Sequence, residues 1–502
     1  MSQPNPPATD HALRTFSARV FLLRLASWAD IAKAHPENVM APIKLGTAAR
    51  LLEDRGHRVT LVDTETGVYR RDEVVNMLRR ERPDVVVVHG ITTALPNLLR
   101  FGRTARELLP DALVVASGQH ATARPQDFFF QGSPFDVATQ VEYEEPLADL
   151  VEAHVRGAPL QSVAGLALPE PAGGFTRTPP RPLRDDLDTL PFPKHELFMR
   201  EEYTVFHPTD VRGPRRWGFV MTSRGCPYPC LYCSPTLRNS YGRKMRFRSA
   251  ENVTDELAYL ARLGATVVHM KDDIFTIDRE RTLALCDAIQ RRGLRLSWTC
   301  QTRADCVDLE LLKAMRAAGC CTVSYGIESG SPRILEVLRK RESVEDSLNA
   351  AAWTRAAGLH LVTFYLLGNP TETLSDMEMT LALAKRIDPD LLQVGFFTPY
   401  PGSPFYEEQY REQGESLDPD DLSHYNRVQV NFSAVPTDEL MRFQRRFYRE
   451  IILSPRFAAR FARNRLRGLP ANLGAEMRFF RLSAKFLLKS LTPGRKAAAV
   501  PS

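Results

Sequence analysis

Short apolar runs alternate with amphipathic segments over the first third of the chain. The apolar runs are residues 19–24, 57–63, 84–89 and 112–117. Residues 42–56 between the first two runs have helical spacing and end on a glycine, as many helices do. Buried strands separated by helical lengths are typical of parallel sheets with helices on both faces. We therefore predict an α/β domain with a doubly wound parallel sheet over residues 18–157.

The same alternation returns in the second half of the chain. The strand-like runs are residues 266–270, 296–300, 321–325, 360–367 and 391–397. Each run is followed by polar or glycine-containing residues, and barrels of parallel strands carry their chemistry at that end of the strands. We predict a partial (β/α) barrel over residues 214–410.

The remaining segments have weaker patterns. We expect a disordered tail over residues 1–17 and a stiff, proline-rich linker over residues 158–213. Residues 411–502 should form a helical extension that includes an amphipathic helix near 438–453. Two further segments, 456–467 and 479–489, combine basic and apolar residues. They favour ordinary docking helices, with a peripheral contact to an anionic membrane surface as the alternative.

Composition adds limits to this picture. The chain has 502 residues and 43% hydrophobic content, enough for two or three domains. It shows no uninterrupted apolar span and no signal-peptide pattern at its start, so we expect a cytoplasmic enzyme. The formal net charge of +6 is modest for this length and does not indicate binding to nucleic acid.

Three cysteines in one short loop are the most informative feature of the sequence. Cys226, Cys230 and Cys233 have a spacing at which thiolates can converge on one iron-sulfur cluster. Three ligands for a four-iron (4Fe-4S) cluster leave one iron open to a cofactor or substrate. A zinc site would need a fourth Cys or His nearby, and a disulfide framework suits short secreted chains. The other five cysteines fit buried apolar positions better: Cys286, Cys300, Cys306, Cys320 and Cys321.

The C-x3-C-x2-C loop, with Tyr232 before its last cysteine, resembles the signature of radical S-adenosylmethionine (SAM) enzymes. The resemblance implies that the amino and carboxylate groups of SAM chelate the open iron. Reductive cleavage of SAM then produces a 5′-deoxyadenosyl radical, and Tyr232 would lie against the adenine. Residues 221–225 fit a strand end that enters the loop, and a helix is expected from about Glu251.

The strand ends of the barrel offer partners for the charges of SAM. Its amine and ribose diol favour acidic partners, and its carboxylate favours a guanidinium. The family resemblance and this chemistry select Asp272, Asp273, Arg303, Glu328 and Ser329, of which Glu328 and Ser329 match a Gly-Ile-Glu-Ser-Gly motif. The alternative for each is a helix cap or a solvated surface group.

The first domain presents small polar residues at two strand ends, 89–93 and 117–122, where ligands of doubly wound sheets bind. With residues 135–147, they resemble the end of the cobalamin-binding domain that precedes the barrel in one subgroup of radical SAM enzymes. The candidate cobalamin contacts are Thr92, Thr93, Ser117, Gly118, His120 and Thr122. The chain departs from the family pattern at Gln119, where a second glycine is usual, and at residues 140–142, where Arg-Gly-Glu is usual. It also has no Asp-x-His-x-x-Gly motif to supply a histidine below the cobalt.

Together these features predict a cobalamin-dependent radical SAM enzyme. Our first hypothesis is methylation of an unactivated carbon in a natural-product or lipid-type substrate, with electrons from a flavodoxin or ferredoxin. Cyclisation, rearrangement or oxidation without methyl transfer is the alternative within the family. A tRNA methylthiotransferase should carry further cysteines in its first domain, and no cysteine precedes Cys226. A non-catalytic sensor role for the first domain also remains, because of its departures from the family pattern.

Three aromatic residues at the mouth of the predicted barrel are candidates for the substrate pocket. They are Phe396, Tyr400 and Phe405. Aromatic residues at such positions belong to the core just as often, so that alternative stays open as well.

Overall fold

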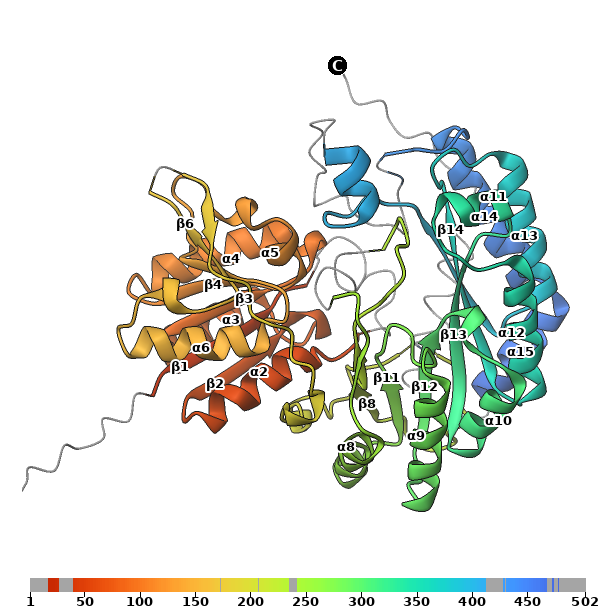
Figure 1. Cartoon of the computed structure of the whole chain (residues 1–502), viewed down its shortest axis with the longest axis horizontal. Helices are drawn as coiled ribbons and strands as arrows, with labels where there is room; N and C mark the ends of the chain where they lie inside the picture. Colours follow the sequence, from red (N-terminus) through yellow and green to blue (C-terminus); the bar gives the residue numbers. More distant parts are fainter. Residues whose placement is uncertain are drawn as a thin grey trace, which may run out of the picture.

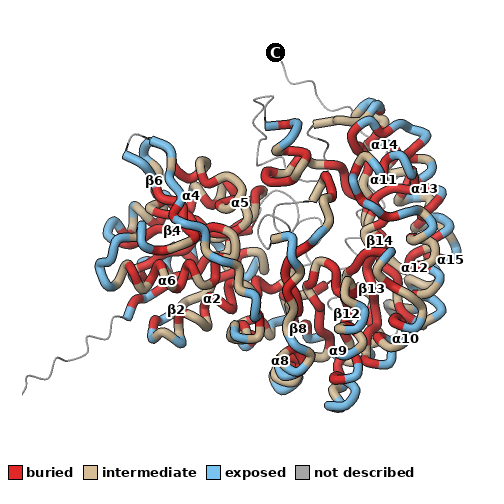
Figure 2. Tube along the Cα trace, in the orientation of Figure 1, coloured by how far each residue is buried: buried red, intermediate tan, exposed pale blue. Residues whose placement is uncertain are grey.

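The computed structural model describes residues 17–26, 39–171, 173–205, 207–233, 242–411, 428, 430–466, 472–473 and 477. Two α/β domains lie side by side, the first coloured red to yellow and the second green to blue (Figure 1). In each, the strands are mainly buried, and exposed positions lie on the outer helices and loops (Figure 2). The prediction of a tail over residues 1–17 lies outside the described residues except for Ser17, whose hydroxyl donates to Gly56 O at 2.9 Å.

The first domain is built on a seven-stranded sheet with the order β2-β1-β3-β4-β5-β6-β7. Its strands are β1 (Arg19–Arg24), β2 (Arg58–Asp63), β3 (Val85–His89), β4 (Leu113–Ser117), β5 (Val137–Thr139), β6 (Leu166–Pro169) and β7 (Phe175–Arg177). The first five strands pair in parallel. The chain reverses its direction of winding between β1 and β3, and the carboxyl ends of such strands are where doubly wound sheets bind their ligands. The predicted doubly wound sheet is confirmed.

Helices cover both faces of this sheet. They are α2 (Ile43–Asp54), α3 (Arg71–Glu81), α4 (Leu95–Leu108), α5 (Gln119–Ala123) and α6 (Glu144–Val155). Alternate residues of one strand enter different cores: Val86 and Val88 pack on one side of the sheet, and Val85 and Val87 pack on the other. This two-sided burial explains why β3 is apolar throughout instead of alternating with polar residues.

The structure differs from the predicted linker over its first part. Strands β6 and β7 form an antiparallel hairpin that adds to the edge of the first sheet. Gly173 and Gly174 both have positive φ, of 93° and 91°, and allow the tight turn between the strands. Residues 166–177 therefore belong to the first domain, and the connecting segment begins after them.

The second domain has six parallel strands in the order β15-β14-β13-β12-β11-β8. They are β8 (Trp217–Val220), β11 (Val267–Met270), β12 (Ser297–Thr302), β13 (Cys320–Glu328), β14 (His360–Leu367) and β15 (Leu391–Phe396). Their helices are α8 (Ala250–Arg262), α9 (Arg279–Arg291), α10 (Leu309–Ala317), α11 (Pro332–Val337), α12 (Val344–Ala356) and α13 (Leu374–Ile387). The strands follow one another in chain order, with β8 and β15 at the edges of the sheet. The predicted partial barrel is confirmed.

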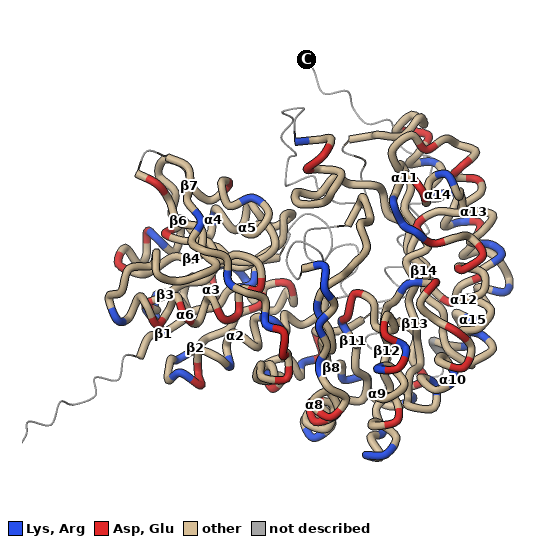
Figure 3. Tube along the Cα trace, viewed as in Figure 1, with Lys and Arg blue, Asp and Glu red and all other residues tan. Residues whose placement is uncertain are grey.

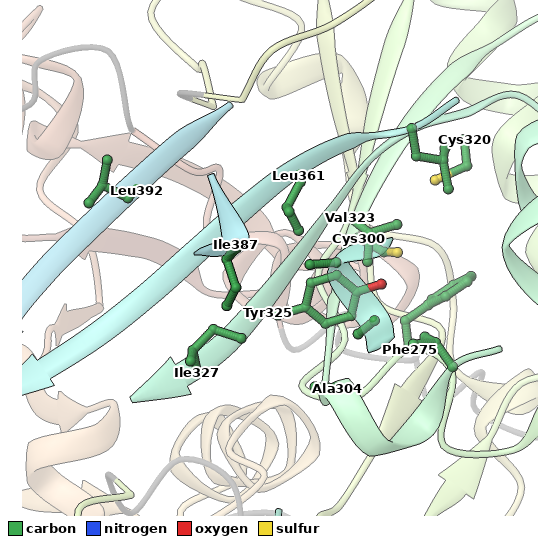
Figure 4. Packing of buried hydrophobic residues seen from close by; sticks show 14 of the residues in the cluster. Phe275, Cys300, Ala304, Cys320, Val323, Tyr325, Ile327, Leu361, Ile387 and Leu392 are labelled. Atoms are coloured by element: carbon green, nitrogen blue, oxygen red, sulfur yellow. The ribbon is translucent and has the colours of Figure 1, made fainter. Parts of the chain in front are cut away.

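The core of the barrel lies between its strands and outer helices. Tyr325 and Ile327 of β13 pack there together with Phe275 and Cys300 (Figure 4). Cys286 and Cys320 belong to the same cluster, and Cys321 is buried on the neighbouring strand position. The burial of these cysteines fits their predicted role as small apolar residues.

The connecting segment holds the two domains together. Phe198 of this segment packs against Gly46 of α2, where a Cβ would lie 2.6 Å from the ring. His195 forms a hydrogen bond with α8, with its Nε2 2.6 Å from Glu256 Oε1. Tyr203 donates from its hydroxyl to Asp63 at the end of β2, at 3.0 Å. These contacts attach the connecting segment to both domains, as expected of a stiff linker.

The helical extension packs onto the barrel. Helix α14 (Thr437–Ile452) matches the predicted amphipathic helix and buries Leu440, Phe443, Phe447 and Ile451. Helix α15 (Pro455–Leu466) follows, and its Arg460 pairs with Asp388 at 2.6 Å. This contact favours the docking interpretation of residues 456–467, whereas residues 479–489 lie outside the described part of the chain.

The surface carries both signs of charge. Basic and acidic positions are interspersed over the two domains (Figure 3). Among the described residues, no helix has the length and apolarity to cross a membrane.

Candidate active site

The cysteine loop leaves the end of β8 through a tightly held turn. Thr222 and Ser223 both donate backbone N–H and hydroxyl hydrogen bonds to the carboxylate of Asp272. Asp272 thus anchors the entry of the loop. This role satisfies its carboxylate, and the predicted contact of Asp272 with SAM stays a prediction.

A glycine then places the first cysteine. Gly225 has φ of 104°, and a Cβ there would lie 2.3 Å from Lys244 O. A side chain at this position would collide with backbone, so the close approach requires glycine. Cys226 N donates to Gly242 O at 3.2 Å, and Cys233 N donates to Cys230 O at 3.2 Å.

The three thiols fit an iron-sulfur cluster as a donor set. All three are free of disulfides, with Cys226 and Cys230 buried and Cys233 half-buried. Burial raises the pKa of each thiol, so a metal that replaces the proton is favoured over a bare thiolate. In the described part of the chain, no three Cys, His, Asp or Glu residues could hold a single metal ion. A four-iron cluster binds each cysteine through a different iron, so its ligands need not meet at one point.

Tyr232 and Glu328 meet beside the cysteine loop. The Tyr232 hydroxyl donates to Glu328 Oε1 at 2.9 Å. Glu328 has φ of 65°, and the register between β13 and β14 shifts between Gly326 and Glu328. Burial raises the pKa of Glu328, against the opposing effects of Lys340 and of the hydrogen bond from Tyr232. The strained backbone conformation directs this acid to the carboxyl end of the strand, as expected of a binding residue.

Two residues beyond our sequence predictions complete a buried charge network. Lys340 Nζ lies 3.8 Å from Glu328 Oε1 and 3.7 Å from Glu342 Oε1. The residues on either side of Lys340 both have positive φ, of 53° and 56°. Such a conformation is rare for a non-glycine residue. It is visible only in the structure, so no signal in the sequence pointed to Lys340 or Glu342.

Arg303 closes the other end of this network. Its Nε lies 3.2 Å from Glu342 Oε1, and its guanidinium also pairs with Asp305 at 2.9 Å. The guanidinium carbon lies 3.6 Å from the centroid of the Tyr228 ring, inside the cysteine loop. Burial raises the pKa of Glu342 to about 7, although Lys340 and Arg303 oppose the shift. Arg303 is therefore held beside the cysteine loop, where we predicted a partner for the carboxylate of SAM.

The remaining predicted SAM residues differ in their surroundings. Ser329 accepts from Ser331 N at 3.1 Å and lies 3.1 Å from Thr380 Oγ1, so it shapes the turn after β13. Within the described part of the chain, Asp273 receives no such set of hydrogen bonds. Burial and the neighbouring Asp272 raise the pKa of Asp273 to about 8, and burial lowers the pKa of Lys271 to about 8. Both groups can exchange a proton near neutral pH at the carboxyl end of β11.

The predicted cobalamin residues gather at the ends of β3 and β4. Gly118 has φ of 108°, and a Cβ there would lie 2.3 Å from Gly90 O. The ring of His120 lies between Thr92 Oγ1 at 3.2 Å and Asp127 Oδ2 at 3.0 Å. Among the residues that the structure describes, the buried Thr93 Oγ1 has no hydrogen-bond partner. A cradle in which a side chain is excluded and a hydroxyl is left without a partner fits a large flat ligand.

The other residues of this face are held by local hydrogen bonds. Ser117 Oγ accepts from Thr139 Oγ1 at 2.9 Å, and Thr122 Oγ1 donates to Gly118 O at 3.2 Å and accepts from Val141 N at 3.0 Å. Val141 has φ of 54°, which is unusual for a β-branched residue. The family pattern has glycine at this position, and the chain keeps the left-handed conformation without it.

The aromatic residues suggested for a substrate pocket occupy different places. Phe396 belongs to the barrel core, and Phe405 packs with Leu231 of the cysteine loop in a separate apolar cluster. Tyr400 is half-buried in the turn after β15. The core alternative thus holds for Phe396 and Phe405.

Comparison with known proteins agrees with both halves of this site. Residues 220–384 match the radical SAM superfamily, and residues 29–151 match the B12 binding domain. An uncharacterised methyltransferase of Pyrococcus horikoshii is 31% identical over 367 residues, which are 73% of this chain and 78% of that protein. The anaerobic magnesium-protoporphyrin IX monomethyl ester cyclase of Rubrivivax gelatinosus is 27% identical over 378 residues, which are 74% of this chain and 65% of the cyclase.

A solved structure shows the same fold. The radical S-adenosylmethionine methyltransferase TsrM from Kitasatospora setae, with cobalamin and a 4Fe-4S cluster bound, matches with a TM-score of 0.63 at 20% identity. The match covers 78% of this chain and 77% of TsrM. The chain therefore belongs to the radical SAM enzymes that carry a cobalamin-binding domain. This membership confirms the resemblance found in the sequence and implies a 4Fe-4S cluster, SAM and cobalamin as cofactors.

Proposed function

We propose that this protein is a cobalamin-dependent radical SAM methyltransferase acting on an unactivated carbon of a natural-product or lipid-type substrate. One observation carries the proposal: the carboxyl ends of the two sheets are in contact, since Arg124 Nη1, after α5, donates to the Tyr406 hydroxyl, after β15, at 2.7 Å. Lys271 at the end of β11 is close enough to Arg24 at the end of β1 for that charge to lower its pKa. His89 at the end of β3 is affected by Lys271 in the same way. Groups bound at the two sheets would thus be neighbours.

The protein's part is to bind, orient and exclude water. When bound, the three cofactors supply a 5′-deoxyadenosyl radical and a transferable methyl group. Cys226, Cys230 and Cys233 would hold the cluster, and Glu328 with Tyr232 offers an acid and an aromatic surface for SAM. Gly118 and Thr93 would accept cobalamin. A small-molecule substrate would then be held between the two sheets, and an electron donor of the flavodoxin or ferredoxin type would reduce the cluster.

Radical chemistry without methyl transfer is the second candidate. The cyclase relative favours it, since its identity extends over 74% of this chain. The two functions share the cofactors and differ in the product. A substrate that gains one methyl group supports the methyltransferase, and a product of unchanged carbon count supports the alternative.

The test is anaerobic reconstitution with iron, sulfide and hydroxocobalamin, followed by assays for 5′-deoxyadenosine and S-adenosylhomocysteine. Both products, with retained cobalamin, would support the methyltransferase. 5′-Deoxyadenosine alone would favour the second candidate, and a chain that never binds cobalamin would contradict both. Cys233→Ser should lose the cluster, whereas the matched Cys306→Ser should keep it, because Cys306 lies outside the cysteine loop, with its thiol 3.8 Å from the Tyr228 hydroxyl and 3.5 Å from Asp305 Oδ1.

A further inference from the structure

A buried ion network joins the two domains beside the cysteine loop. Arg224 Nη2 lies 2.7 Å from Glu144 Oε1, and its Nη1 lies 3.1 Å from Glu142 Oε2. Arg246 pairs with the same Glu142, and Lys44 Nζ lies 3.6 Å from Glu144 Oε2. The exposed fractions of the Arg224, Arg246, Glu142 and Glu144 side chains are 8%, 3%, 11% and 2%. Desolvating these charges is costly, so the geometry of the network is demanding.

The acidic side of the network continues the candidate cobalamin face. Glu142 directly follows Gln140 and Val141 after β5. Gln140 Nε2 donates to Ala121 O at 2.8 Å, and Val141 N donates to Thr122 Oγ1 at 3.0 Å. A ligand that settles on α5 therefore also acts on the loop that carries Glu142.

The basic side of the network continues the cysteine loop. Arg224 precedes Gly225 and Cys226 directly, and Arg246 pairs with Arg224 across the short β9–β10 ladder (Ser223–Arg224 and Arg246–Phe247). Burial opposes ionisation of Glu144, but Arg224 and Lys44 outweigh it and hold the pKa of Glu144 below its usual range. The charges are thus present together at neutral pH, and the cysteine loop cannot shift far without separating them.

We infer that Glu142, Glu144 and Arg224 form a relay through which cobalamin binding and cluster assembly strengthen each other. The inference rests on the proposed cofactors of this site. Because coupling between two binding sites is reciprocal, assembly of the cluster should raise the affinity for cobalamin by the same factor as the reverse. Couplings of this kind range from about 5-fold to about 150-fold. Glu142, Glu144 and Arg224 are positioning residues in this account, since they act through the two loops.

The test measures hydroxocobalamin affinity anaerobically, by absorbance titration of the full chain before and after cluster reconstitution. In the wild type, the cluster should lower the dissociation constant at least about 5-fold. Glu142→Gln leaves Arg224 paired with Glu144, and Arg246 still donates to Arg184 O at 2.8 Å, so the chain should still fold and bind both cofactors. Its coupling factor should fall toward one. Arg224→Lys, which keeps the charge but loses the bidentate geometry, should give an intermediate factor.

A matched control comes from Lys244, two residues before Arg246. Lys244 pairs with Asp185 of the connecting segment at 2.9 Å, but both side chains are exposed. Lys244→Met also removes an ion pair with the connecting segment, and it should keep the wild-type coupling. A purely structural role for the buried network would lower the melting temperature of Glu142→Gln and leave its coupling factor unchanged, which would overturn the inference.

The outcomes separate this inference from the proposed function. A wild type that binds hydroxocobalamin equally well with and without the cluster overturns the relay alone. A wild type that binds no hydroxocobalamin overturns the cobalamin assignment, and the relay falls with it. Failure to form a methylated product with a chosen substrate does not enter the measurement, because only binding is followed.

Discussion

The two halves of the site solve the problem of binding in opposite ways. At the ends of β3 and β4, the first domain presents a glycine, hydroxyls and histidines. Gly118 approaches Gly90 so closely that no side chain fits there, which leaves the surface open to a ligand. At the ends of β12 and β13, the barrel presents buried charges in contact with each other, from Glu328 to Lys340 and from Glu342 to Arg303. The first arrangement suits a large ring system. The second suits a small ligand that carries charges of both signs.

The largest expected effect separates the two halves completely. Cys230→Ser should abolish cluster assembly and reduce formation of 5′-deoxyadenosine by more than about 10³-fold, because the radical chemistry belongs to the cofactor. Hydroxocobalamin should still bind, with the affinity of the cluster-free wild type. Iron content and the electron paramagnetic resonance signal would measure the first effect. A variant that retained a wild-type signal would show that the cluster is held elsewhere.

The stability of the barrel half of the site, with its buried charges, should be sensitive to the loss of one charge. Lys340→Met leaves Glu328 and Glu342 buried without this cation, which should lower the free energy of unfolding by about 3 kcal/mol. The exposed Lys313, 2.9 Å from Glu310, provides the control. Lys313→Met should cost at most about 0.5 kcal/mol. Urea denaturation of the cluster-free chains would compare them, and equal losses would contradict a special role for Lys340.

The first-domain half of the site, at the ends of β3 and β4, should lose stability and cobalamin affinity when side-chain volume is added. Gly118→Ala places a methyl group against Gly90 O and forces a positive φ on alanine, so we expect a loss of about 2 kcal/mol and weaker cobalamin binding. Cluster assembly should be unaffected. Gly157 also has positive φ but nothing within 4 Å of its added Cβ. Gly157→Ala should therefore show about 1 kcal/mol of strain and normal cobalamin binding.

The stability of the first-domain half of the site should also depend on pH. Burial, with Arg24, Lys44 and Lys271 nearby, lowers the pKa of His89 to about 3 from 6.5. The unfolded chain binds a proton at this histidine below pH 6.5, whereas the folded chain does not. The stability from this site is thus full above pH 6.5 and is lost as the pH falls toward 3. His89→Gln should reduce the loss at pH 4 by about 3 kcal/mol, measured by denaturation across this range. An unchanged slope would contradict the assignment.

The smallest effect concerns the backbone of the first domain. Val141→Gly relieves a left-handed conformation at a β-branched residue and should raise the free energy of unfolding by about 1 kcal/mol. Val155→Gly, at the end of α6, should lower it by a similar amount, because glycine disfavours the helix. Loss of stability in both variants would show that the Val141 side chain contributes more through packing than its backbone costs.

Much of the fold was readable from local patterns. The apolar runs of residues 84–89 and 112–117 became β3 and β4, and the helix expected at 438–453 became α14. Such patterns depend on neighbours in the sequence, so they survive without knowledge of the fold. The hairpin of β6 and β7 was missed, because its short strands lie among prolines and glycines that favour a linker interpretation.

The residues of the site also divide into those that the sequence predicts and those that only the structure reveals. The sequence by itself predicted the three cysteines as cluster ligands and Tyr232 and Glu328 as contacts of SAM, since their spacing and motif indicate that chemistry. Only the tertiary structure decided that Asp272 anchors the loop, that Lys340 and Glu342 join Arg303, and that Arg224 meets Glu142 across the domain boundary. Asp272 is 50 residues from Thr222 and Glu342 is 39 residues from Arg303, while Arg224 and Glu142 belong to different domains. Their pairing depends on where the strands end in space. A pattern along the sequence does not contain the distances between residues that only the fold brings together.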